Sequence, residues 1–217
     1  QEIKEELTQI QSSREELKEA RPGIAVILVG ERKDSQTYVR MKRRVAQELG
    51  FLSLEANLSA DISEEALLEE VRKFNQNPQV HGILIQLPLP SHIKEERILN
   101  EVSLDKDIDG FHAVNIGKLS MKGREPTFIP CTPKGCLELL DREGVKIDGA
   151  NAVVLGRSNI VGIPMAMLLL HRNATVSICH SRTQNVEEYL KRADIIVAAC
   201  GQPRYVKKEW VKPGAVI

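Results

Sequence analysis

The stretch from residue 152 to residue 170 constrains the fold of this chain more than any other. An apolar run at 152–155 predicts a buried parallel strand that stops at Gly156. Gly162 and the apolar run 165–170 then predict a helix. A strand, a glycine turn and a helix in this order point backbone N–H groups and the positive end of the helix dipole at a phosphate.

The glycine spacing of this stretch departs from the dinucleotide fingerprint G-x-G-x-x-G. Ser158 stands at the position of the second glycine, and Gly162 comes one residue late. Apolar strand–glycine–helix units also occur without a ligand. The stretch alone therefore leaves two interpretations open, a nucleotide-binding turn and a purely structural one.

The same alternation of strand and helix runs through the whole chain. Apolar runs predict buried strands, polar and amphipathic stretches predict helices between them, and the region 105–133 is expected to be loops. Such alternation predicts an open α/β sheet. Helices are expected at 2–20 (with Leu17 on its apolar side), 36–49, 63–75, 132–142 (with Thr132 as N-cap), 165–170 and 186–191. Strands are expected at 24–29, 52–58, 82–87, 152–155, 174–179 and 194–199, with a further strand beginning at 214–217.

These elements divide the chain into two α/β domains. We place the boundary in the helix start after the loop region, so the domains are residues 1–131 and 132–217. The second domain has the order strand, helix, strand, helix, strand, which is typical of half of a Rossmann fold.

Composition gives no reason to expect nucleic acid or a membrane as a partner. The chain has 30 basic and 30 acidic residues, and no apolar run approaches the roughly 18 residues of a membrane span. No signal peptide is visible, so we expect a cytoplasmic protein, with an organellar form that has lost its targeting segment as the alternative. The four cysteines form no C-x-x-C pair. They are expected to be reduced and mostly buried, without a metal; a site with Cys131, Cys136 and a histidine is the disfavoured alternative.

Candidate side chains gather in the first domain. Tyr38 and Lys42 lie four residues apart and share a helix face, where an aromatic platform and a proton donor would meet. The alternative is a solvated helix surface. Gln86 is a polar residue ending an apolar strand, where open α/β sheets bind ligands, or else an edge glutamine bonded to nearby backbone. Acidic residues alternate between 105 and 109, but the later calcium ligands of an EF-hand are missing.

Six motifs together resemble one family, the bifunctional methylenetetrahydrofolate dehydrogenase/methenyltetrahydrofolate cyclohydrolases. The resemblance covers essentially the whole chain, and the motifs follow in the family's order. They are SQTYVRMK at 35–42, HGILIQLPLP at 81–90, KDIDGFH at 106–112, PCTPKG at 130–135, GRSNIVG at 156–162 and HSRT at 180–183.

The resemblance implies an activity and a set of roles. It implies oxidation of 5,10-methylenetetrahydrofolate with a nicotinamide cofactor, then hydrolysis of the methenyl product to 10-formyltetrahydrofolate. It also implies two α/β domains around a cleft, a homodimer, and a serine as the normal residue at 158. Lys42 would be the catalytic acid/base with Gln86 beside it, Tyr38 would stack on the folate, and Asp109 would hold the pterin. The remaining implied contacts are Leu87 and Pro88 for the substrate, and Gly156, Ser158, Ile160 and Thr183 for the cofactor.

The second strand of the predicted nucleotide-binding domain favours NADP over NAD. NAD-preferring folds place an acidic residue near the end of this strand to bind the ribose 2′-hydroxyl. Here the strand ends in Cys179 and His180 and is followed by Ser181 and Arg182, with no acid. Together with Arg157, Ser181 and Arg182 are the expected contacts of a 2′-phosphate.

Two other functions stay open from the sequence. Family chains continue beyond Ile217 into a helix that returns to the first domain, and they begin with a segment before Gln1, so we expect a truncated chain. A truncated chain could be a non-catalytic folate- or nucleotide-binding protein. The third possibility is an unrelated NADP-dependent oxidoreductase with a similar two-domain fold.

Overall fold

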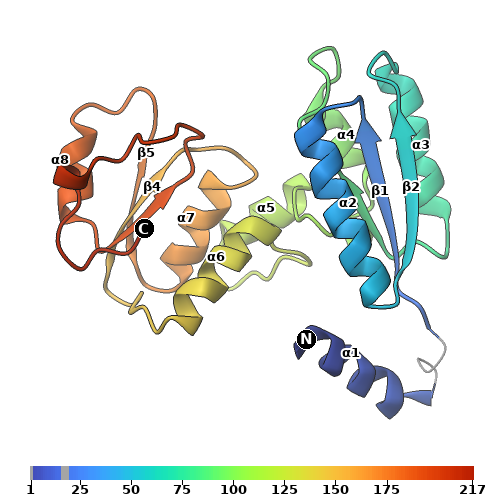
Figure 1. Ribbon diagram of the computed structural model, residues 1–217, viewed down its shortest axis with the longest axis horizontal. Coiled ribbons are helices and arrows are strands. Elements are labelled where there is room, and N and C mark those ends of the chain that lie inside the picture. Colours follow the sequence, from blue (N-terminus) through green and yellow to red (C-terminus); the bar gives the residue numbers. More distant parts are fainter. Residues whose placement is uncertain (1, 16–19) are drawn as a thin grey trace. The chain divides into compact units, whose positions relative to one another are not determined.

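The computed structural model describes residues 2–15 and 20–217 and divides into two compact units, Gln1–Ile108 and Asp109–Ile217 (Figure 1). Both units are α/β, as predicted. Each is built on a three-stranded parallel sheet whose first strand is central.

The first unit is organised around β1 (Gly23–Val29), which pairs with β2 (Leu52–Leu58) on one side and β3 (Gly82–Ile85) on the other. Successive side chains of β1 point to opposite faces of the sheet. One set packs on α3 (Glu64–Gln76) and α4 (Glu95–Glu101), and the other packs on Val39 of α2 (Lys33–Glu48). The central strand is therefore buried on both faces, which explains its continuous apolar sequence.

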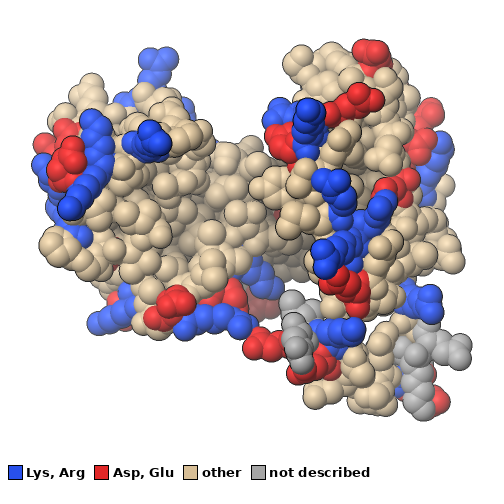
Figure 2. Space-filling model, viewed as in Figure 1, with Lys and Arg blue, Asp and Glu red and all other residues tan. Residues whose placement is uncertain are grey.

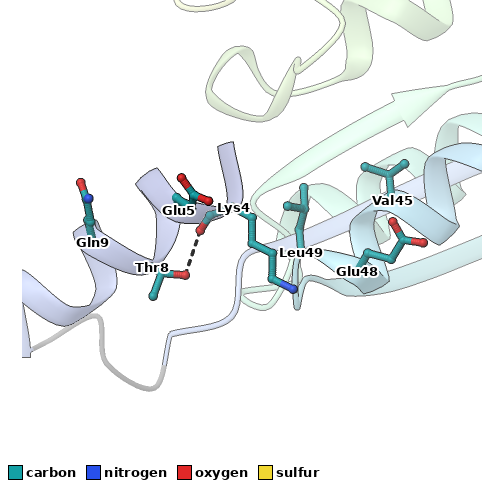
Figure 3. Close-up of a pocket in the computed structure, with 7 residues that line it drawn as sticks. All are labelled: Lys4, Glu5, Thr8, Gln9, Val45, Glu48 and Leu49. Atoms are coloured by element: carbon teal, nitrogen blue, oxygen red, sulfur yellow. Dashed lines mark hydrogen bonds between the residues drawn. The ribbon is translucent and has the colours of Figure 1, made fainter. Parts of the chain in front are cut away.

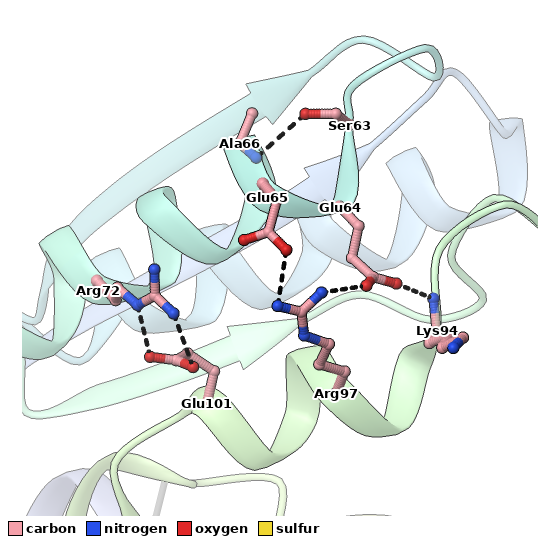
Figure 4. A network of polar contacts seen from close by, with 8 residues as sticks. All are labelled: Ser63, Glu64, Glu65, Ala66, Arg72, Lys94, Arg97 and Glu101. Carbon is pink, nitrogen blue, oxygen red and sulfur yellow. Dashed lines mark hydrogen bonds and ion pairs between the residues drawn. The ribbon is translucent and has the colours of Figure 1, made fainter.

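Polar contacts join α3 to α4 on the surface of this unit (Figure 4). Ser63 caps α3 by accepting a hydrogen bond from the N–H three residues on, as its sequence position predicts. Arg97 of α4 reaches Glu64 at 2.6 Å, and Arg72 of α3 reaches Glu101 at 2.8 Å. The arginines of these pairs are about half exposed to solvent, so each pair contributes little energy, and the buried side chains carry most of the packing.

The second unit has β4 (Asn151–Leu155) between β5 (Thr175–Cys179) and β6 (Ile195–Ala198), all parallel. One face is covered by α6 (Cys131–Arg142) and α7 (Gly162–His171), and the other by α8 (Val186–Arg192). Val216 pairs with Ile195, so the expected further strand begins beside β6. None of the helices in the described chain has the length and apolar character needed to cross a bilayer.

The prediction that residues 105–133 form only loops is wrong in part. It contains the short helices η2 (Leu104–Lys106) and α5 (Ala113–Leu119), followed by α6, which begins one residue before Thr132 with Pro130 as its N-cap. The ring of His112 caps α5 by accepting a hydrogen bond from the N–H of Val114 at 3.1 Å. Histidine is not among the usual capping residues, so no helix start could be recognised here from the residues alone.

Three further differences from the predicted elements concern helices. Helix α4 was not predicted, because seven residues with one fully buried side chain, Ile98, carry no clear periodicity. Helix α1 (Glu2–Ser13) ends earlier than the predicted helix 2–20, and the predicted position of Leu17 lies outside the described residues. The short helix η3 (Lys208–Trp210) follows β6 and was also not predicted.

Candidate functional site

The strand order places a crevice at a definite edge of each sheet. In both units the first strand lies between the second and the third. The chain therefore moves to one side of the first strand to form the second, and then crosses back to the other side to form the third. Open α/β sheets bind ligands outside the carboxyl ends of their strands at this reversal. The crevice therefore lies at the ends of β1 and β3 in the first unit, and at the ends of β4 and β6 in the second.

The first unit brings Lys42 and Gln86 together at this edge. Gln86 follows β3, and its backbone N–H extends the ladder by donating to Ile27 at 2.9 Å. The side-chain N–H of Gln86 donates to the carbonyl of Leu87 at 2.9 Å, which turns the amide oxygen toward α2. The Lys42 ammonium lies 3.5 Å from that oxygen. Lys42 is half-buried and reaches across to the end of β3, whereas its neighbours Arg43 and Arg44 on the same helix are exposed.

Tyr38 lies one turn before Lys42 on α2 and is 61% exposed. A large aromatic side chain this exposed can offer a ring face to a ligand. Leu87 is half-buried and Pro88 exposed, directly after Gln86. Basic side chains lie along α2, with acidic ones beside them, in the space-filling view (Figure 2). The predicted substrate residues of the first unit thus adjoin one edge of its sheet.

The segment around Asp109 is held against β3 by contacts that the sequence did not indicate. The Lys106 ammonium donates to the carbonyls of Phe74, Asn75 and Asn77 at 3.2, 2.7 and 3.0 Å, and so caps the end of α3. Asp107 is buried, and its backbone forms a parallel β-bridge with that of Ile83 in β3. Asp109 follows as a half-buried residue, where the second unit begins. Lys106 is therefore a structural residue that fixes this segment along the sheet.

In the second unit, two glycines make the turn after β4 possible. A Cβ on Gly156, whose φ is +124°, would lie 2.4 Å from the carbonyl oxygen of Ala199 at the end of β6. A Cβ on Gly162 would lie 2.4 Å from the carbonyl oxygen of Gly156. These close approaches explain why the second glycine of the turn comes at 162. It is needed where the helix start meets the turn, and only glycine fits there.

Ser158 explains the missing middle glycine of the fingerprint. Its Oγ accepts hydrogen bonds from the N–H groups of Val161 and Gly162, both at 3.2 Å. The N–H of Ile163 donates to the Ser158 carbonyl at 3.0 Å. The first N–H groups of α7 are thus already bonded, which corrects the expectation that they point at a phosphate. Within the described chain, the turn's remaining backbone donors are those of residues 157–160, and they include Ile160.

A tight turn after β5 presents the residues expected to select the cofactor. The N–H of His180 donates to Thr183 Oγ1 at 2.9 Å, and the N–H of Thr183 donates back to the His180 carbonyl at 2.8 Å. Ser181 and Arg182 stand on this turn with exposed side chains, and Arg157 is exposed after Gly156. The carboxyl end of β5 carries no acidic residue. The exposed arginines suit a 2′-phosphate. The acidic side chain that usually accepts a hydrogen bond from the ribose 2′-hydroxyl of NAD is missing here.

The described cysteines form no disulfide, and only Cys179 is buried; Cys131 is exposed and the other two are intermediate. The expectation of mostly buried thiols is therefore wrong for three positions. Burial raises the pKa of the Cys179 thiol, so it stays a neutral part of the core. No cluster of three or more His, Cys, Asp or Glu side chains in the described chain could hold a metal ion.

A hollow of about 890 Å³ lies between α1 and the end of α2 (Figure 3). Its lining contains Lys4, Glu5, Thr8 and Gln9 from α1, with Val45, Glu48 and Leu49 from α2. The Thr8 hydroxyl donates within its own helix, to the Lys4 carbonyl at 2.8 Å. None of the predicted site residues lines this hollow. Its size therefore does not mark the functional site.

Comparison with known proteins assigns both parts of the chain to one family. Residues 1–109 match the sequence model of one protein family, the tetrahydrofolate dehydrogenase/cyclohydrolase catalytic domain. Residues 130–217 match the model of that family's NAD(P)-binding domain. The chain therefore contains sequence of both domains, with the catalytic domain first.

Individual relatives agree with this assignment. Bifunctional protein FolD 2 of Arabidopsis thaliana is 59% identical over 196 residues, which are 90% of this chain and 66% of that protein. Bifunctional protein FolD of Syntrophobacter fumaroxidans is 48% identical in an alignment of 220 positions, gaps included, that covers 100% of this chain and 72% of that protein. Against the three similar Arabidopsis proteins, the chain spans 66%, 54% and 56% of their length.

A solved structure extends the likeness to three dimensions. The Trypanosoma brucei N5,N10-methylenetetrahydrofolate dehydrogenase-cyclohydrolase, complexed with NADP and an inhibitor, has a TM-score of 0.91 and 42% identity to this chain. The match covers 97% of this chain and 72% of that one. The NAD-dependent methylenetetrahydrofolate dehydrogenase of Saccharomyces cerevisiae shares the fold with a TM-score of 0.83 at 19% identity. The chain therefore belongs to the tetrahydrofolate dehydrogenase/cyclohydrolase family.

Proposed function

We propose that this chain oxidises 5,10-methylenetetrahydrofolate to the 5,10-methenyl compound and then hydrolyses that product to 10-formyltetrahydrofolate. The observation that supports this most directly is the approach of the Lys42 ammonium to the Gln86 amide at 3.5 Å, at the sheet edge where ligands bind. Both groups lie in the part of the chain that matches the family's catalytic domain. The function places the chain in one-carbon metabolism.

The oxidation depends on positioning. NADP supplies the hydride acceptor, and no side chain has to gain or lose a proton in this step. Tyr38 would hold the flat part of the folate by stacking, and Gln86, Leu87 and Pro88 would line the position of the one-carbon unit. Asp109 would hold the pterin by hydrogen bonds. Orientation of this kind can lower a barrier substantially without any acid or base.

The hydrolysis needs proton transfers, and Lys42 is the proposed carrier. Water attacks the methenyl carbon and its oxygen becomes the formyl oxygen, so both of its protons must leave. One goes to the nitrogen released when a ring C–N bond breaks, and the other goes to solvent with the positive charge of the methenyl group. The hydrogen bond from Lys42 to Gln86 would keep the ammonium near the reacting carbon, because Gln86 is itself fixed by the Leu87 carbonyl. A positioned acid or base of this kind typically supplies about 10²–10⁴-fold.

For the cofactor we propose NADP, held by both turns of the second unit. Backbone N–H groups of residues 158–160 and the Ser158 hydroxyl hydrogen would bind phosphate, with Gly156 allowing close approach. Arg157, Ser181 and Arg182 would bind the 2′-phosphate. This proposal rests on their exposure, on the absence of an acid after β5, and on the NADP named in the Trypanosoma brucei complex.

We also propose the domain division, assembly and location that the sequence predicted. The folate-binding domain would be residues 1–131 and the NADP-binding domain 132–217; the family matches at 1–109 and 130–217 are compatible with that boundary. The chain would act as a homodimer. A cytoplasmic location is proposed, with an organelle as the alternative, because relatives named chloroplastic and mitochondrial are 60% and 55% identical.

Substitution of Lys42 separates the two reactions. Lys42→Met keeps the apolar stem but removes the proton, so we expect cyclohydrolase activity to fall by about 10²-fold or more while part of the dehydrogenase activity remains. Tyr38→Ala should reduce both activities. The measurement is a pair of steady-state assays, one started from methylene- and one from methenyltetrahydrofolate. Lys33→Met, an exposed position on the same helix, is the control.

The outcome decides between an enzyme and a binding protein. If Lys42→Met hydrolysed methenyltetrahydrofolate at the parent rate, Lys42 would not be the proton carrier. If the parent chain produced no methenyl compound from methylenetetrahydrofolate and NADP, the proposed oxidation would be wrong for this chain.

A further inference from the structure

The turn after β5 is held by hydrogen bonds of the His180 and Thr183 side chains to its backbone. His180 and Thr183 exchange two hydrogen bonds, His180 N–H to Thr183 Oγ1 at 2.9 Å and Thr183 N–H to the His180 carbonyl at 2.8 Å. The His180 ring adds a third bond, since its Nδ1 accepts a hydrogen bond from the N–H of Arg182 at 3.2 Å. Three hydrogen bonds within four residues therefore fix the backbone of this turn.

This turn is anchored to the core at its first end. Cys179 immediately precedes it, is 1% exposed, and pairs with Leu155 of β4. The carbonyl of Cys179 also accepts the N–H of Gly156 at 2.8 Å. The turn is thus tied directly to the glycine turn that carries Arg157. Its second end has no such strand pairing in the described chain, so the bonds of Thr183 determine where Ser181 and Arg182 stand.

We propose that Thr183 is a positioning residue that sets the preference for a 2′-phosphorylated nucleotide. This proposal rests on the proposed NADP-binding function and assigns Thr183 a role other than direct contact. Its Oγ1 accepts the His180 N–H and so fixes the backbone that carries Ser181 and Arg182, whose exposed side chains can meet a phosphate. A nucleotide without the 2′-phosphate makes no use of these two side chains.

Removal of the Thr183 oxygen tests the proposal. Thr183→Val keeps the branched shape and removes the acceptor, whereas Thr183→Ser keeps the acceptor and removes the methyl group. Thr175→Val makes the same chemical change at an exposed position at the other end of β5 and serves as the control. The probes are 2′,5′-ADP and 5′-AMP, whose affinities for the full chain are measured by calorimetry. Both measurements are independent of catalysis.

We expect Thr183→Val to lower the ratio of 2′,5′-ADP affinity to 5′-AMP affinity by about three- to tenfold, which is the net effect of one hydrogen bond. Thr183→Ser and Thr175→Val should keep the parent ratio. An unchanged ratio in Thr183→Val would overturn the proposal, as would a Thr183→Ser variant that behaves like Thr183→Val. If the parent itself failed to prefer 2′,5′-ADP, the NADP assignment would be wrong and the positioning role would fall with it.

Discussion

Replacement of Gly156 by alanine tests the geometry of the nucleotide turn by its effect on stability. The new Cβ would lie 2.4 Å from the carbonyl oxygen and 3.0 Å from the carbonyl carbon of Ala199. Because both are backbone atoms, the ends of β4 and β6 would have to separate. Overpacking of this kind costs about 1–3 kcal/mol. The φ of +124° adds strain of about 1–3 kcal/mol for a residue with a side chain.

Gly144→Ala is the matched control for this substitution. Its φ is +66°, and no atom lies within 4 Å of the position that a Cβ would take, so it has the backbone strain without the collision. We expect Gly144→Ala to lower the free energy of unfolding by about 1–2 kcal/mol. Gly156→Ala should lower it by about 2–6 kcal/mol, the sum of the two effects.

Urea unfolding followed by tryptophan fluorescence measures this difference. The chain has a single tryptophan, Trp210, which is partly buried and packs against a core cluster of the second unit, so its emission reports the unit that is perturbed. The slope of the transition should stay the same while its midpoint falls. If Gly156→Ala were no more destabilising than Gly144→Ala, the close approach of β4 and β6 at this turn would be wrong.

Three other substitutions test separate parts of the structure. Arg157→Ala should weaken NADP binding about ten- to a hundredfold and leave NAD binding nearly unchanged, which fluorescence titration with each cofactor can measure; equal losses would refute the 2′-phosphate assignment. Asp194→Asn should flatten the acid side of the curve of stability against pH. The pKa of Asp194 is lowered by the hydrogen bond from Lys212, so its stabilisation is present above the unfolded carboxyl pKa and is lost as the pH falls through the folded one. Ser63→Ala should lower the free energy of unfolding by about 0.5–2 kcal/mol, measured by thermal or urea unfolding, because it removes the cap of α3.

The strands and long helices could be predicted from the sequence because their patterns are local. Apolar runs marked β1 and β4, which are buried on both faces, and Ser63 marked the start of α3. The short helices α4 and α5 could not be predicted, because tertiary contacts stabilise them more than their own sequences do. The contact of Lys106 with the end of α3 spans about thirty residues, and no local pattern indicates it.

The candidate site could also be predicted only as far as local sequence patterns indicate it. The helix period and the strand-end rule indicated Lys42 and Gln86 separately, but only the fold brings residues 44 positions apart to 3.5 Å. The resemblance indicated Thr183 only as a cofactor contact, because its proposed positioning role depends on a bond to a backbone N–H that no sequence pattern shows. The bond of the His180 ring to the Arg182 N–H was not predicted, since a histidine beside a strand end has no distinctive pattern.

The common strand order of the two units explains how they divide the proposed chemistry. Each sheet has its crevice between the first and third strands, but different groups fill it. In the first unit α2 begins four residues after β1 and presents Lys42 toward the end of β3, with the exposed Tyr38 one turn earlier. In the second unit Gly156 lets backbone approach backbone so closely that no side chain fits at that point. Side chains that can move protons therefore belong to the first unit, and fixed backbone donors that suit phosphates belong to the second.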